Sequence, residues 1–526
     1  MAQSSDAQRR GQWSSKLGFV LAASGSAIGL GNIVFFGANA YRYGAGAFYL
    51  AYLIALCVVG MPVLISELGL GSLTQQAFPQ SLGRIAGRWG ELAGWWGLLN
   101  AAFITMYYVT LLAWVCGMLA GAAGPLWKPE TAVPAFAADA MPNPAGFFFH
   151  MISTWWVVGL VVLVWAANLW IVRRGVSTIE PVVKVFVPLM WIFMIILIVR
   201  GLTLPHGLEG VYLLFTPDFS LMANWEVWQG AASQIFFSLT LGFGVMTAYA
   251  SYLPRDADQT NNGMLTACLN CGFEFLAGLA IFSLLFTFAI APQASTIAMT
   301  FFVIPKGIAA MPAGVRAFGL IFFLLMLLAG LSSSISLIEG INCALLDKFG
   351  WSRRRTLLVT GLVGLTGSIV FALPMVIDHA LASDGTLGLS LLDLVDHWAF
   401  NHGLLLVGVI ECLILGWKLP ASKLREHLNR NGRFRLPAAF DWLLKLVIPG
   451  WLLAILASSV WNKLTHGIYG HAMALDWGRS LPVTAFLAWL VGSVGAALWF
   501  TLRPGLEEAA AAGRAAGAAP EASHGK

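Results

Sequence analysis

The stretch Gly25-Ser26-Ala27-Ile28-Gly29-Leu30-Gly31-Asn32 interrupts the first long apolar segment of the chain. The flanking residues 17–23 and 33–36 have the composition of a membrane helix. Glycine inside a helix costs about 1 kcal/mol relative to alanine, and backbone groups released from a helix cannot stay unpaired in hydrocarbon. Such a break is tolerated where it lines a cavity or binds a ligand. The stretch therefore predicts a binding site within a membrane.

A second break, Ser238-Leu239-Thr240-Leu241-Gly242-Phe243-Gly244, interrupts a later apolar segment in the same way. Interrupted spans at corresponding places in two halves of a chain are typical of secondary transporters, whose substrates bind near the middle of the bilayer. The two breaks together therefore predict a transporter.

The composition of the chain is that of a membrane protein. Of the 526 residues, 58% are hydrophobic and 10% are charged, whereas a soluble domain has about 25% charged residues. Since a span needs about 20 mostly apolar residues, we expect an all-α polytopic membrane protein with twelve transmembrane helices. The expected spans are 16–40, 46–74, 92–122, 150–172, 180–200, 227–253, 263–291, 316–347, 356–376, 388–416, 439–461 and 481–502.

The basic residues indicate how the chain is oriented. Lys and Arg concentrate in the N-terminal segment and in the loops that follow even-numbered spans. Because cytoplasmic loops are rich in Lys and Arg, we expect both termini in the cytoplasm and the protein in a bacterial-type inner membrane. The expected segments are a cytoplasmic N-terminal segment (1–12), a transporter core of spans 1 to 10 (13–417), a basic cytoplasmic loop (418–437), spans 11 and 12 (438–503) and a weakly structured cytoplasmic tail (504–526).

Other classes of function lack support in the sequence. No basic stripe is interleaved with stacking aromatic residues, so we expect no nucleic-acid partner. All six cysteines fall in expected spans without the spacing of metal ligands. No nucleophile–base set projects into the breaks, so we do not expect the protein to be an enzyme. The expected partners are the lipid bilayer and a small zwitterionic substrate. The sequence makes no prediction of oligomeric state.

The residues in the breaks can bind a cation without burying a fixed charge, because unwound carbonyls, hydroxyls and amides supply neutral oxygens. The first break offers carbonyls and Asn32, and the segment 329–336 offers several serines on one helix. Two alternatives stay open: the serines can serve tight helix packing, and Asn32 and Asn270 can form ordinary hydrogen bonds between helices. Ionisable residues within spans are functional candidates, and they are Glu67, Glu274, Asp393, Asp396 and Glu411.

Several motifs together resemble the neurotransmitter:sodium symporter family, and its bacterial branch in particular. They are the break Gly25–Asn32, Gly44-Ala45-Gly46-Ala47-Phe48, Gly60-Met61-Pro62 with Glu67, Phe236-Phe237 through Gly244, Tyr249-Ala250-Ser251-Tyr252, Phe302-Val303-Ile304-Pro305-Lys306 with Met311-Pro312, and Ala329 through Ser333. The resemblance runs in order through residues 10–417. It implies the fold of the bacterial leucine transporter, in which two inverted repeats of five spans (5+5) have spans 1 and 6 unwound, with two peripheral helices added.

The resemblance also implies two sodium sites and a substrate pocket. One sodium site would use Gly25, Ile28, Ala329, Ser332 and Ser333. The other would use Ala27, Asn32, Ser238 and Asn270, completed by the substrate carboxylate. The pocket would be lined by Ala27, Gly29, Gly31, Ile104, Tyr108, Phe237, Thr240, Phe243, Ser333 and Leu337.

Two pocket residues and one carboxylate bear on specificity. Tyr108 would donate its hydroxyl to the substrate carboxylate. Gly29 stands where the family's monoamine carriers have Asp, which leaves room for the substrate's own carboxylate. Glu274 stands where chloride-dependent animal members have Ser, and it resembles the acidic side chain of the chloride-independent bacterial members. We therefore expect transport without chloride, with Glu274 carrying a proton when the empty transporter returns.

The outer gate departs from the family pattern. The family usually continues the first span with Trp-Arg-Phe-Pro, but this chain has Phe35 at the arginine position. That arginine usually pairs with an aspartate of span 10, here Asp396, while Gln234 near the gate is retained. Four alternatives remain open for Asp396: a bound proton, hydration, pairing with His397 or His402, or a cationic substrate.

The inner gate matches the family pattern, with Arg10, Trp13, Asp347 and Tyr252 in place. We therefore expect sodium-coupled import of a neutral, hydrophobic amino acid by alternating access. Two alternatives are a carrier of another zwitterion, such as a betaine or a sulfonate, and a substrate sensor that does not transport.

Overall fold

The structure is a computed structural model that describes residues 11–128, 142–292, 296–378, 392, 395–466 and 480–506. Its described part is helical, without a strand. Each of the twelve expected spans contains a helix or a broken helix, and only the expected start of span 10 lies outside the described residues. The prediction of an all-α fold with twelve spans is therefore confirmed.

The first five spans are built from nine helical elements. They are α2 (Lys16–Ala27), η1 (Gly31–Phe35) and α3 (Phe36–Arg42) in span 1, α4 (Gly46–Ala55), η2 (Leu56–Gly60) and α5 (Met61–Thr74) in span 2, α6 (Phe78–Ala123) in span 3, α8 (Trp156–Val172) in span 4, and α9 (Val176–Leu202) in span 5.

The next five spans repeat this arrangement, again with a broken first member. They are α11 (Trp225–Ser238) and α12 (Val245–Ser251) in span 6, α13 (Gln259–Thr287) in span 7, α16 (Val315–Phe349) in span 8, α17 (Arg353–Ile377) in span 9, and η6 (Asp396–Leu404), α20 (Leu405–Leu413) and η7 (Ile414–Lys418) in span 10. Spans 11 and 12 consist of α22 (Ala439–Trp442), η8 (Leu443–Val447) and α23 (Ile448–His466), and of α24 (Ser480–Leu502).

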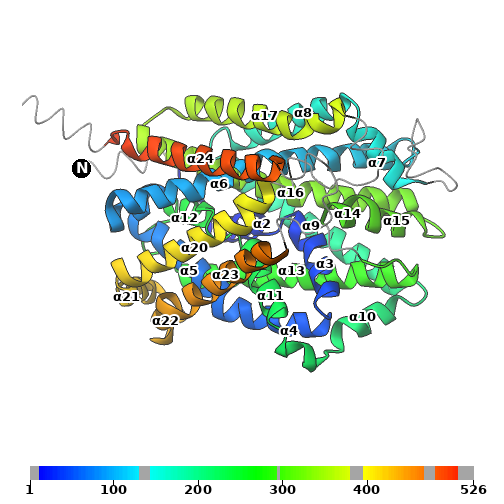
Figure 1. Cartoon of the computed structure of the whole chain (residues 1–526), viewed down its shortest axis with the longest axis horizontal. Helices are drawn as coiled ribbons and strands as arrows, with labels where there is room; N and C mark the ends of the chain where they lie inside the picture. Colours follow the sequence, from blue (N-terminus) through cyan, green and yellow to red (C-terminus); the bar gives the residue numbers. More distant parts are fainter. Residues whose placement is uncertain are drawn as a thin grey trace, which may run out of the picture.

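Shorter helices cap the two ends of the bundle. They are α7 (Pro144–Ile152), α10 (Gly207–Phe215), η4 (Phe219–Ala223), α14 (Thr296–Ala298), η5 (Met299–Val303), α15 (Ile304–Ala309) and α21 (Ala421–Asn431). In Figure 1, α21 lies at the left end, which is the predicted cytoplasmic end, and α7, α10 and α15 lie at the right end. The loops between the spans thus contain short helices.

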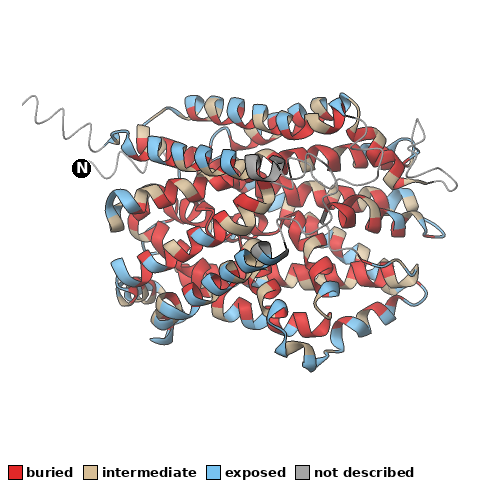
Figure 2. Cartoon of the chain, viewed as in Figure 1, coloured by how far each residue is buried: buried red, intermediate tan, exposed pale blue. Residues whose placement is uncertain are grey.

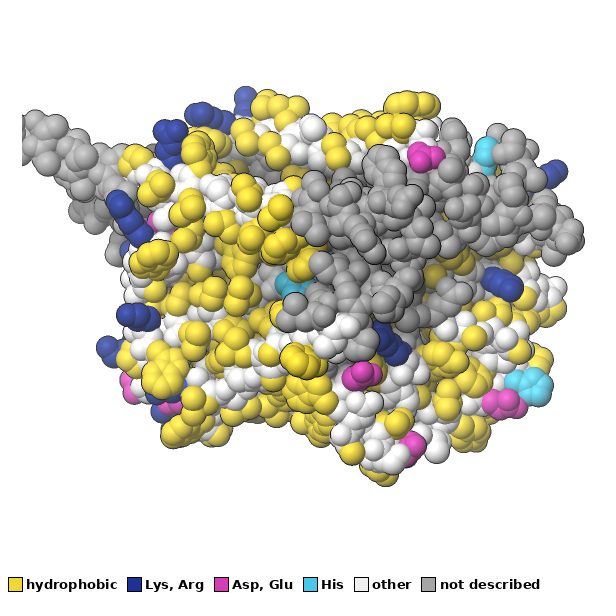
Figure 3. Space-filling model, viewed as in Figure 1, with side chains coloured by type: hydrophobic (Ala, Val, Ile, Leu, Met, Phe, Trp, Pro, Cys, Tyr) yellow, Lys and Arg dark blue, Asp and Glu magenta, His cyan; other side chains and the backbone are white. Residues whose placement is uncertain are grey.

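Length and composition support the membrane assignment. Within the described part, eight helices are long and apolar enough to cross a membrane, and two bent pairs could each supply one more span. One of those pairs is Lys16–Ala27 with Gly31–Arg42, bent by 58° at the first break. Figure 3 shows hydrophobic side chains over much of the visible face, with Lys and Arg mainly toward the end of α21. Exposed apolar side chains on helix faces suit contact with lipid.

The break in span 1 follows from local backbone geometry. Ile28 is extended (φ −74°, ψ 98°) and its N–H binds the carbonyl of Ser24 at 2.7 Å. The next free N–H, that of Gly29, donates to Oδ1 of Asn32 at 2.8 Å. Asn32 therefore acts as a cap for the restarted helix, which explains why an amide follows the glycines.

The break in span 6 relies on left-handed backbone. Gly242 and Gly244 have φ values of 77° and 72°, and Thr240 has 57°. Glycine adopts this region without steric penalty, so the two glycines allow the chain to unwind there. The helix α2 contacts α9, α13 and α16, and Figure 1 places it in the middle of the bundle. Figure 2 shows buried residues along the inner faces of the helices, so both breaks lie in the protein interior.

Candidate functional site

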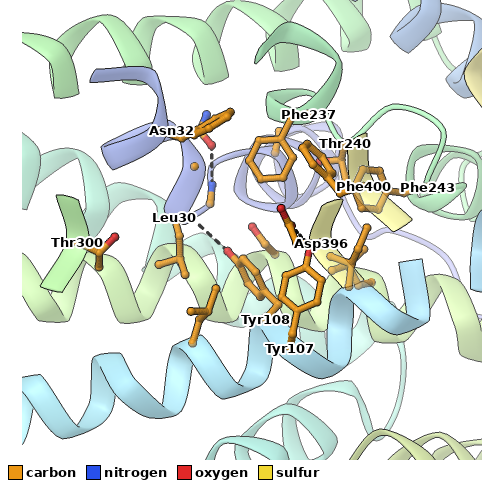
Figure 4. A pocket seen from close by; sticks show the side chains of 18 of the residues that line it. Leu30, Asn32, Tyr107, Tyr108, Phe237, Thr240, Phe243, Thr300, Asp396 and Phe400 are labelled. Carbon is orange, nitrogen blue, oxygen red and sulfur yellow. Dashed lines mark hydrogen bonds between the residues drawn. The ribbon is translucent and has the colours of Figure 1, made fainter. Parts of the chain in front are cut away.

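A cavity of about 260 Å³ lies where the two breaks meet α6 and α16. All ten residues expected from the sequence to contact substrate line it. They are Ala27, Gly29, Gly31, Ile104, Tyr108, Phe237, Thr240, Phe243, Ser333 and Leu337. Figure 4 shows Tyr108, Phe237, Thr240 and Phe243 around this space.

The polar part of the cavity is centred on the first break. The backbone N–H of Leu30 donates to the hydroxyl of Tyr108 at 3.2 Å, as Figure 4 also shows. A Cβ at Gly29 would lie 2.9 Å from that hydroxyl and 2.9 Å from Oγ of Ser333. A side chain at this position would therefore crowd both hydroxyls, and these hydroxyls and the backbone break face the same space.

The cavity also contains residues that sequence reasoning missed. Tyr107, Leu111, Thr300, Phe301 and Phe400 line it together with residues of the expected site. Tyr107 precedes Tyr108, so the adjacent aromatic pair was a usable signal. Thr300 and Phe301 lie on η5, and nothing in the local sequence indicates that this short helix would reach the cavity.

One group of sodium ligands expected from the sequence is gathered by side-chain hydrogen bonds. Nδ2 of Asn32 donates to Oδ1 of Asn270 at 2.7 Å and to Oγ of Ser238 at 3.1 Å. Nδ2 of Asn270 donates to Oγ of Ser238 at 2.5 Å. All three residues are buried. This cluster of neutral oxygens has the donor chemistry that suits an alkali cation.

The second group lies between the first break and α16. Oγ of Ser333 donates to the carbonyl of Ser26 at 2.9 Å and lies 3.4 Å from the carbonyl of Ile28. Oγ of Ser332 donates to the carbonyl of Ala329 at 2.8 Å. A Cβ on Gly25 would lie 3.4 Å from Cβ of Ser332. Carbonyl and hydroxyl oxygens of both segments therefore face each other, again without a charged side chain.

Glu274 belongs to a hydrogen-bonded network beside the first of these groups. It accepts hydrogen bonds from Tyr52 and, at 2.8 Å, from Nε2 of Gln234. Oε1 of Gln234 in turn accepts from Asn39 at 3.0 Å. Glu274 has 0% exposure. The carboxylate of Glu274 therefore has two hydrogen-bond donors. Gln234, expected at the outer gate, binds Glu274 on one side and Asn39 on the other.

Aromatic rings and a carboxylate, at residues predicted to form the outer gate, also line the cavity. The ring of Phe35 packs edge-on against Phe237 at 5.9 Å, and Phe237 packs edge-on against Phe400 at 4.4 Å between centroids. The carboxylate of Asp396 accepts a hydrogen bond of 2.5 Å from the hydroxyl of Tyr107, drawn in Figure 4. This donor was not among the partners considered from the sequence.

Pairing with His397 or His402 was one of the four alternatives for Asp396. His402 makes contacts of 2.8 Å with the carbonyl of His397 and 3.1 Å with Oγ of Ser459. Its ring therefore links span 10 to span 11. Asp393, another of the ionisable residues in the expected spans, lies outside the described residues.

The inner-gate residues that the structure describes are held by hydrogen bonds. Arg10 lies outside the described residues. Nε1 of Trp13 donates to the carbonyl of Tyr249 at 2.9 Å, and the N–H of Ala77 donates to Asp347 at 2.7 Å. The hydroxyl of Tyr252 donates to Glu339 at 2.7 Å.

Glu339 is the centre of an ion pair that sequence reasoning missed. It is fully buried and pairs with Arg353, whose guanidinium also donates to the carbonyl of Val172 at 2.7 Å. The cluster joins spans 4, 6, 8 and 9 at the predicted cytoplasmic end. Tyr252 thus adds a hydrogen bond to the carboxylate of this pair.

The chain is similar in sequence and in structure to sodium-dependent transporters. The model of the sodium:neurotransmitter symporter family matches residues 10–122 and 147–499. A relative from Methanocaldococcus jannaschii, an uncharacterized sodium-dependent transporter named MJ1319, is 36% identical over 88% of this chain and 93% of its own. A sodium- and chloride-dependent taurine transporter of Rattus norvegicus is 28% identical over 90% of this chain and 82% of its own. The crystal structure of MhsT in complex with L-phenylalanine has a TM-score of 0.74 and 29% identity, and the match covers 86% of this chain and all of MhsT.

Proposed function

The chain belongs to the sodium:neurotransmitter symporter family, and from that premise we propose that it imports a neutral, hydrophobic α-amino acid together with sodium. Membership makes it a multi-pass membrane transporter that uses sodium and moves a small molecule. It is not an enzyme. Beyond family membership, we propose the substrate class, two sodium sites, a location in the cytoplasmic membrane with both termini inside, and transport that does not depend on chloride.

The composition of the cavity supports this substrate class. Hydroxyls and unwound backbone near Gly29 and Tyr108 suit the carboxylate and ammonium groups of an amino acid. The middle of the cavity is lined by Ile104, Phe237 and Phe243, which suit an apolar side chain. A solved relative holds L-phenylalanine. One observation carries the proposal: the cavity has unwound backbone and hydroxyl groups on one side and apolar side chains in its middle.

Sodium would bind the two groups of neutral oxygens. The first group consists of Ala27, Asn32, Ser238 and Asn270. Ala27 and Asn32 also line the cavity, so a substrate carboxylate bound there would add a negative charge to this sodium site. Sodium and substrate would then each raise the affinity of the other, which is coupling in the thermodynamic sense. The second group would hold sodium between the first break and α16 and stabilise their contact.

The test is sodium-driven uptake by the purified full-length protein in proteoliposomes. An inward sodium gradient should drive accumulation of radiolabelled L-phenylalanine or L-leucine, and replacement of sodium by choline should abolish it. Sodium-dependent binding without accumulation would instead indicate a sensor. No sodium-dependent interaction with any amino acid in a competition panel would overturn the substrate assignment.

A sulfonate or betaine substrate is the second candidate. It is favoured by the similarity to a taurine transporter over most of the chain. The same panel separates the two, because taurine or glycine betaine should compete with L-phenylalanine only if the polar end of the cavity accepts their charged groups. Potent competition by taurine alone would favour this candidate.

Chloride independence rests on Glu274, whose carboxylate would supply the negative charge beside the first sodium site. Removal of chloride should leave uptake by the native protein unchanged. In Glu274→Ser, uptake should become dependent on chloride, since the anion would replace the missing carboxylate. Uptake by this variant that is equal with and without chloride would contradict the proposal.

A further inference from the structure

Buried polar side chains follow the first half of α13, from its predicted cytoplasmic end to the first group of expected sodium ligands. Thr260, Thr266 and Asn270 have 0% exposure, and Gln259 and Asn262 have 2%. Residues four apart on a helix are neighbours on one face, so Asn262, Thr266 and Asn270 form a polar stripe. A rise of 1.5 Å per residue places Thr266 about 6 Å, and Asn262 about 12 Å, along the helix from Asn270.

Several polar atoms of these side chains have no hydrogen-bond partner among the described residues. They are Oγ1 of Thr260, Oγ1 of Thr266, Oδ1 of Asn262 and Nε2 of Gln259. A threonine inside a helix can bond to the carbonyl four residues earlier, as Thr287 of the same helix does at 2.8 Å, but Thr266 does not. A buried polar atom without a partner costs free energy, so several of them on one helix need an explanation.

The polar stripe borders the interior that contains the first break. The helix α13 packs against α2, α5, α9 and η1. Asn270 ends the stripe, and its side chain bonds to Asn32 on η1 and to Ser238 on α11. On α2, Ser24 is also buried, and its Oγ has no partner in the part of the chain that the structure describes. These hydroxyls therefore belong to two helices that pack together on the predicted cytoplasmic side of the break.

The polar stripe has the chemistry of a route for a cation. Residues 259–273 contain no charged side chain, so no fixed charge of this segment repels or traps a sodium ion. Nδ2 of Asn262 donates to Oε1 of Gln259 at 3.5 Å, which leaves Oδ1 of Asn262 able to bind a cation. Neutral hydroxyl and amide oxygens can bind an alkali ion and still release it, as movement along several weak sites requires.

We propose that sodium released from Asn32, Ser238 and Asn270 leaves toward the cytoplasm along the polar stripe, where the oxygens of Thr266 and Asn262 bind it in turn. This inference rests on the proposed sodium site and adds two residues that act during release. Water enters with the ion and supplies partners to the buried hydroxyls. The route is closed in the described conformation and opens when α2 and α13 separate.

Thiol labelling tests the route without a transported substrate. Thr266→Cys introduces a thiol of similar size, and the probe is methanethiosulfonate ethylammonium, a small cation, applied to the full-length protein in detergent. Peptide mass spectrometry separates labelling at this position from labelling of the six native cysteines. Without sodium, Thr266→Cys should be labelled several-fold faster than Ala267→Cys, since Ala267 is equally buried at the same depth but on another face. Saturating sodium should slow the labelling, because it stabilises the closed conformation.

Uptake into proteoliposomes tests the role of the hydroxyl. Thr266→Val keeps the shape of the side chain but removes the oxygen, so the initial rate of sodium-driven uptake should fall about two- to tenfold. Thr266→Ser should restore the rate. In both variants the sodium concentration for half-maximal thermal stabilisation should stay near the native value, because Thr266 is not a ligand of the proposed sodium site. Ser283→Ala, the matched control, removes a buried hydroxyl without a described partner from the outer half of α13 and should not slow uptake.

Three outcomes would overturn the proposal. Labelling of Thr266→Cys no faster than that of Ala267→Cys would show that the cationic probe does not reach the polar stripe. Native uptake by Thr266→Val would show that the hydroxyl does not bind the moving ion, and equal slowing in Ser283→Ala would attribute the effect to packing. Stabilisation by sodium checks that each variant is folded. If the native protein takes up no amino acid but the labelling follows the prediction, the proposed function fails and the route stands.

Discussion

The hydroxyl of Tyr107 donates a hydrogen bond to the carboxylate of Asp396, and both residues line the cavity. In this family that carboxylate is expected to pair with an arginine, and here the arginine position is occupied by Phe35. The hydrogen bond joins span 3 to span 10 across the cavity. We therefore infer that a tyrosine–carboxylate bond and packed aromatic rings close the outer gate, where an ion pair would otherwise do so.

Removal of the Tyr107 hydroxyl should weaken that closure. A hydrogen bond to a charged group contributes about 1.5–3 kcal/mol, so bound substrate should dissociate about tenfold faster or more from Tyr107→Phe. Uptake should fall accordingly. The measurement is the dissociation rate of radiolabelled amino acid in the presence of sodium, and Tyr212→Phe, at an exposed tyrosine, is the control. Equal rates in native protein and Tyr107→Phe would refute the assigned role.

The ring of Phe35 should contribute separately to the same closure. An edge-to-face aromatic pair contributes about 0.5–1.5 kcal/mol beyond its buried area, which corresponds to about two- to tenfold in rate. Phe35→Leu keeps an apolar side chain but loses the ring contact with Phe237, so substrate dissociation should accelerate within that range.

A rescue experiment distinguishes the gate from general packing. Phe35→Arg places a guanidinium where it can reach Asp396, so it should restore slow dissociation in the Tyr107→Phe background. Phe35→Gln in the same background is the uncharged control and should not restore it. Rescue by both substitutions would show that charge at this position is irrelevant.

The sequence predicted the parts of the fold that depend on composition and local backbone. Long apolar runs indicated the twelve spans, and glycines at Gly242 and Gly244 indicated the second break because they allow left-handed backbone. The bonding of Tyr107 to Asp396 could not be predicted, since 289 residues separate the two in sequence. Their contact depends on how spans 3 and 10 pack.

The functional site likewise contains residues that the sequence predicted and residues that it did not. Residues on the two breaks were identified from the family motifs, and they line one cavity in the structure. Their roles in binding sodium and substrate stay predictions. The buried pair of Glu339 and Arg353 was missed, because Arg353 looked like an ordinary cytoplasmic anchor in the run 353–355. Only the packed structure separates it from its exposed neighbour Arg354.

Adjacent serines on α16 provide a matched test of the second sodium site. Oγ of Ser333 faces the carbonyls of Ser26 and Ile28, whereas Oγ of Ser334 donates to Asn168 at 2.6 Å on the opposite side. Loss of a ligand to a cation should cost about 1.5–3 kcal/mol. Ser333→Ala should therefore need about tenfold more sodium, or more, for half-maximal thermal stabilisation.

The control for this prediction is Ser334→Ala. It removes an identical hydroxyl one residue away, so its sodium requirement should stay near that of the native protein even if its melting temperature falls. An equal rise in the sodium requirement of both variants would attribute the effect to helix packing, which is the alternative reading of the serine run.

The ion pair at the predicted cytoplasmic end should stabilise the fold only as an intact unit. Arg353→Gln leaves the carboxylate of Glu339 fully buried with Tyr252 as its remaining described donor. Removal of one partner of a buried pair is destabilising by about 3–5 kcal/mol, whereas replacement of both partners can be neutral. We therefore expect a clearly lower melting temperature in detergent for Arg353→Gln, and recovery of much of the loss in the double variant Arg353→Gln/Glu339→Gln.

Arg354→Gln, at the exposed neighbour, should melt like the native protein. A double variant no more stable than Arg353→Gln would mean that the lost bond to Val172, rather than the uncompensated charge, causes the destabilisation.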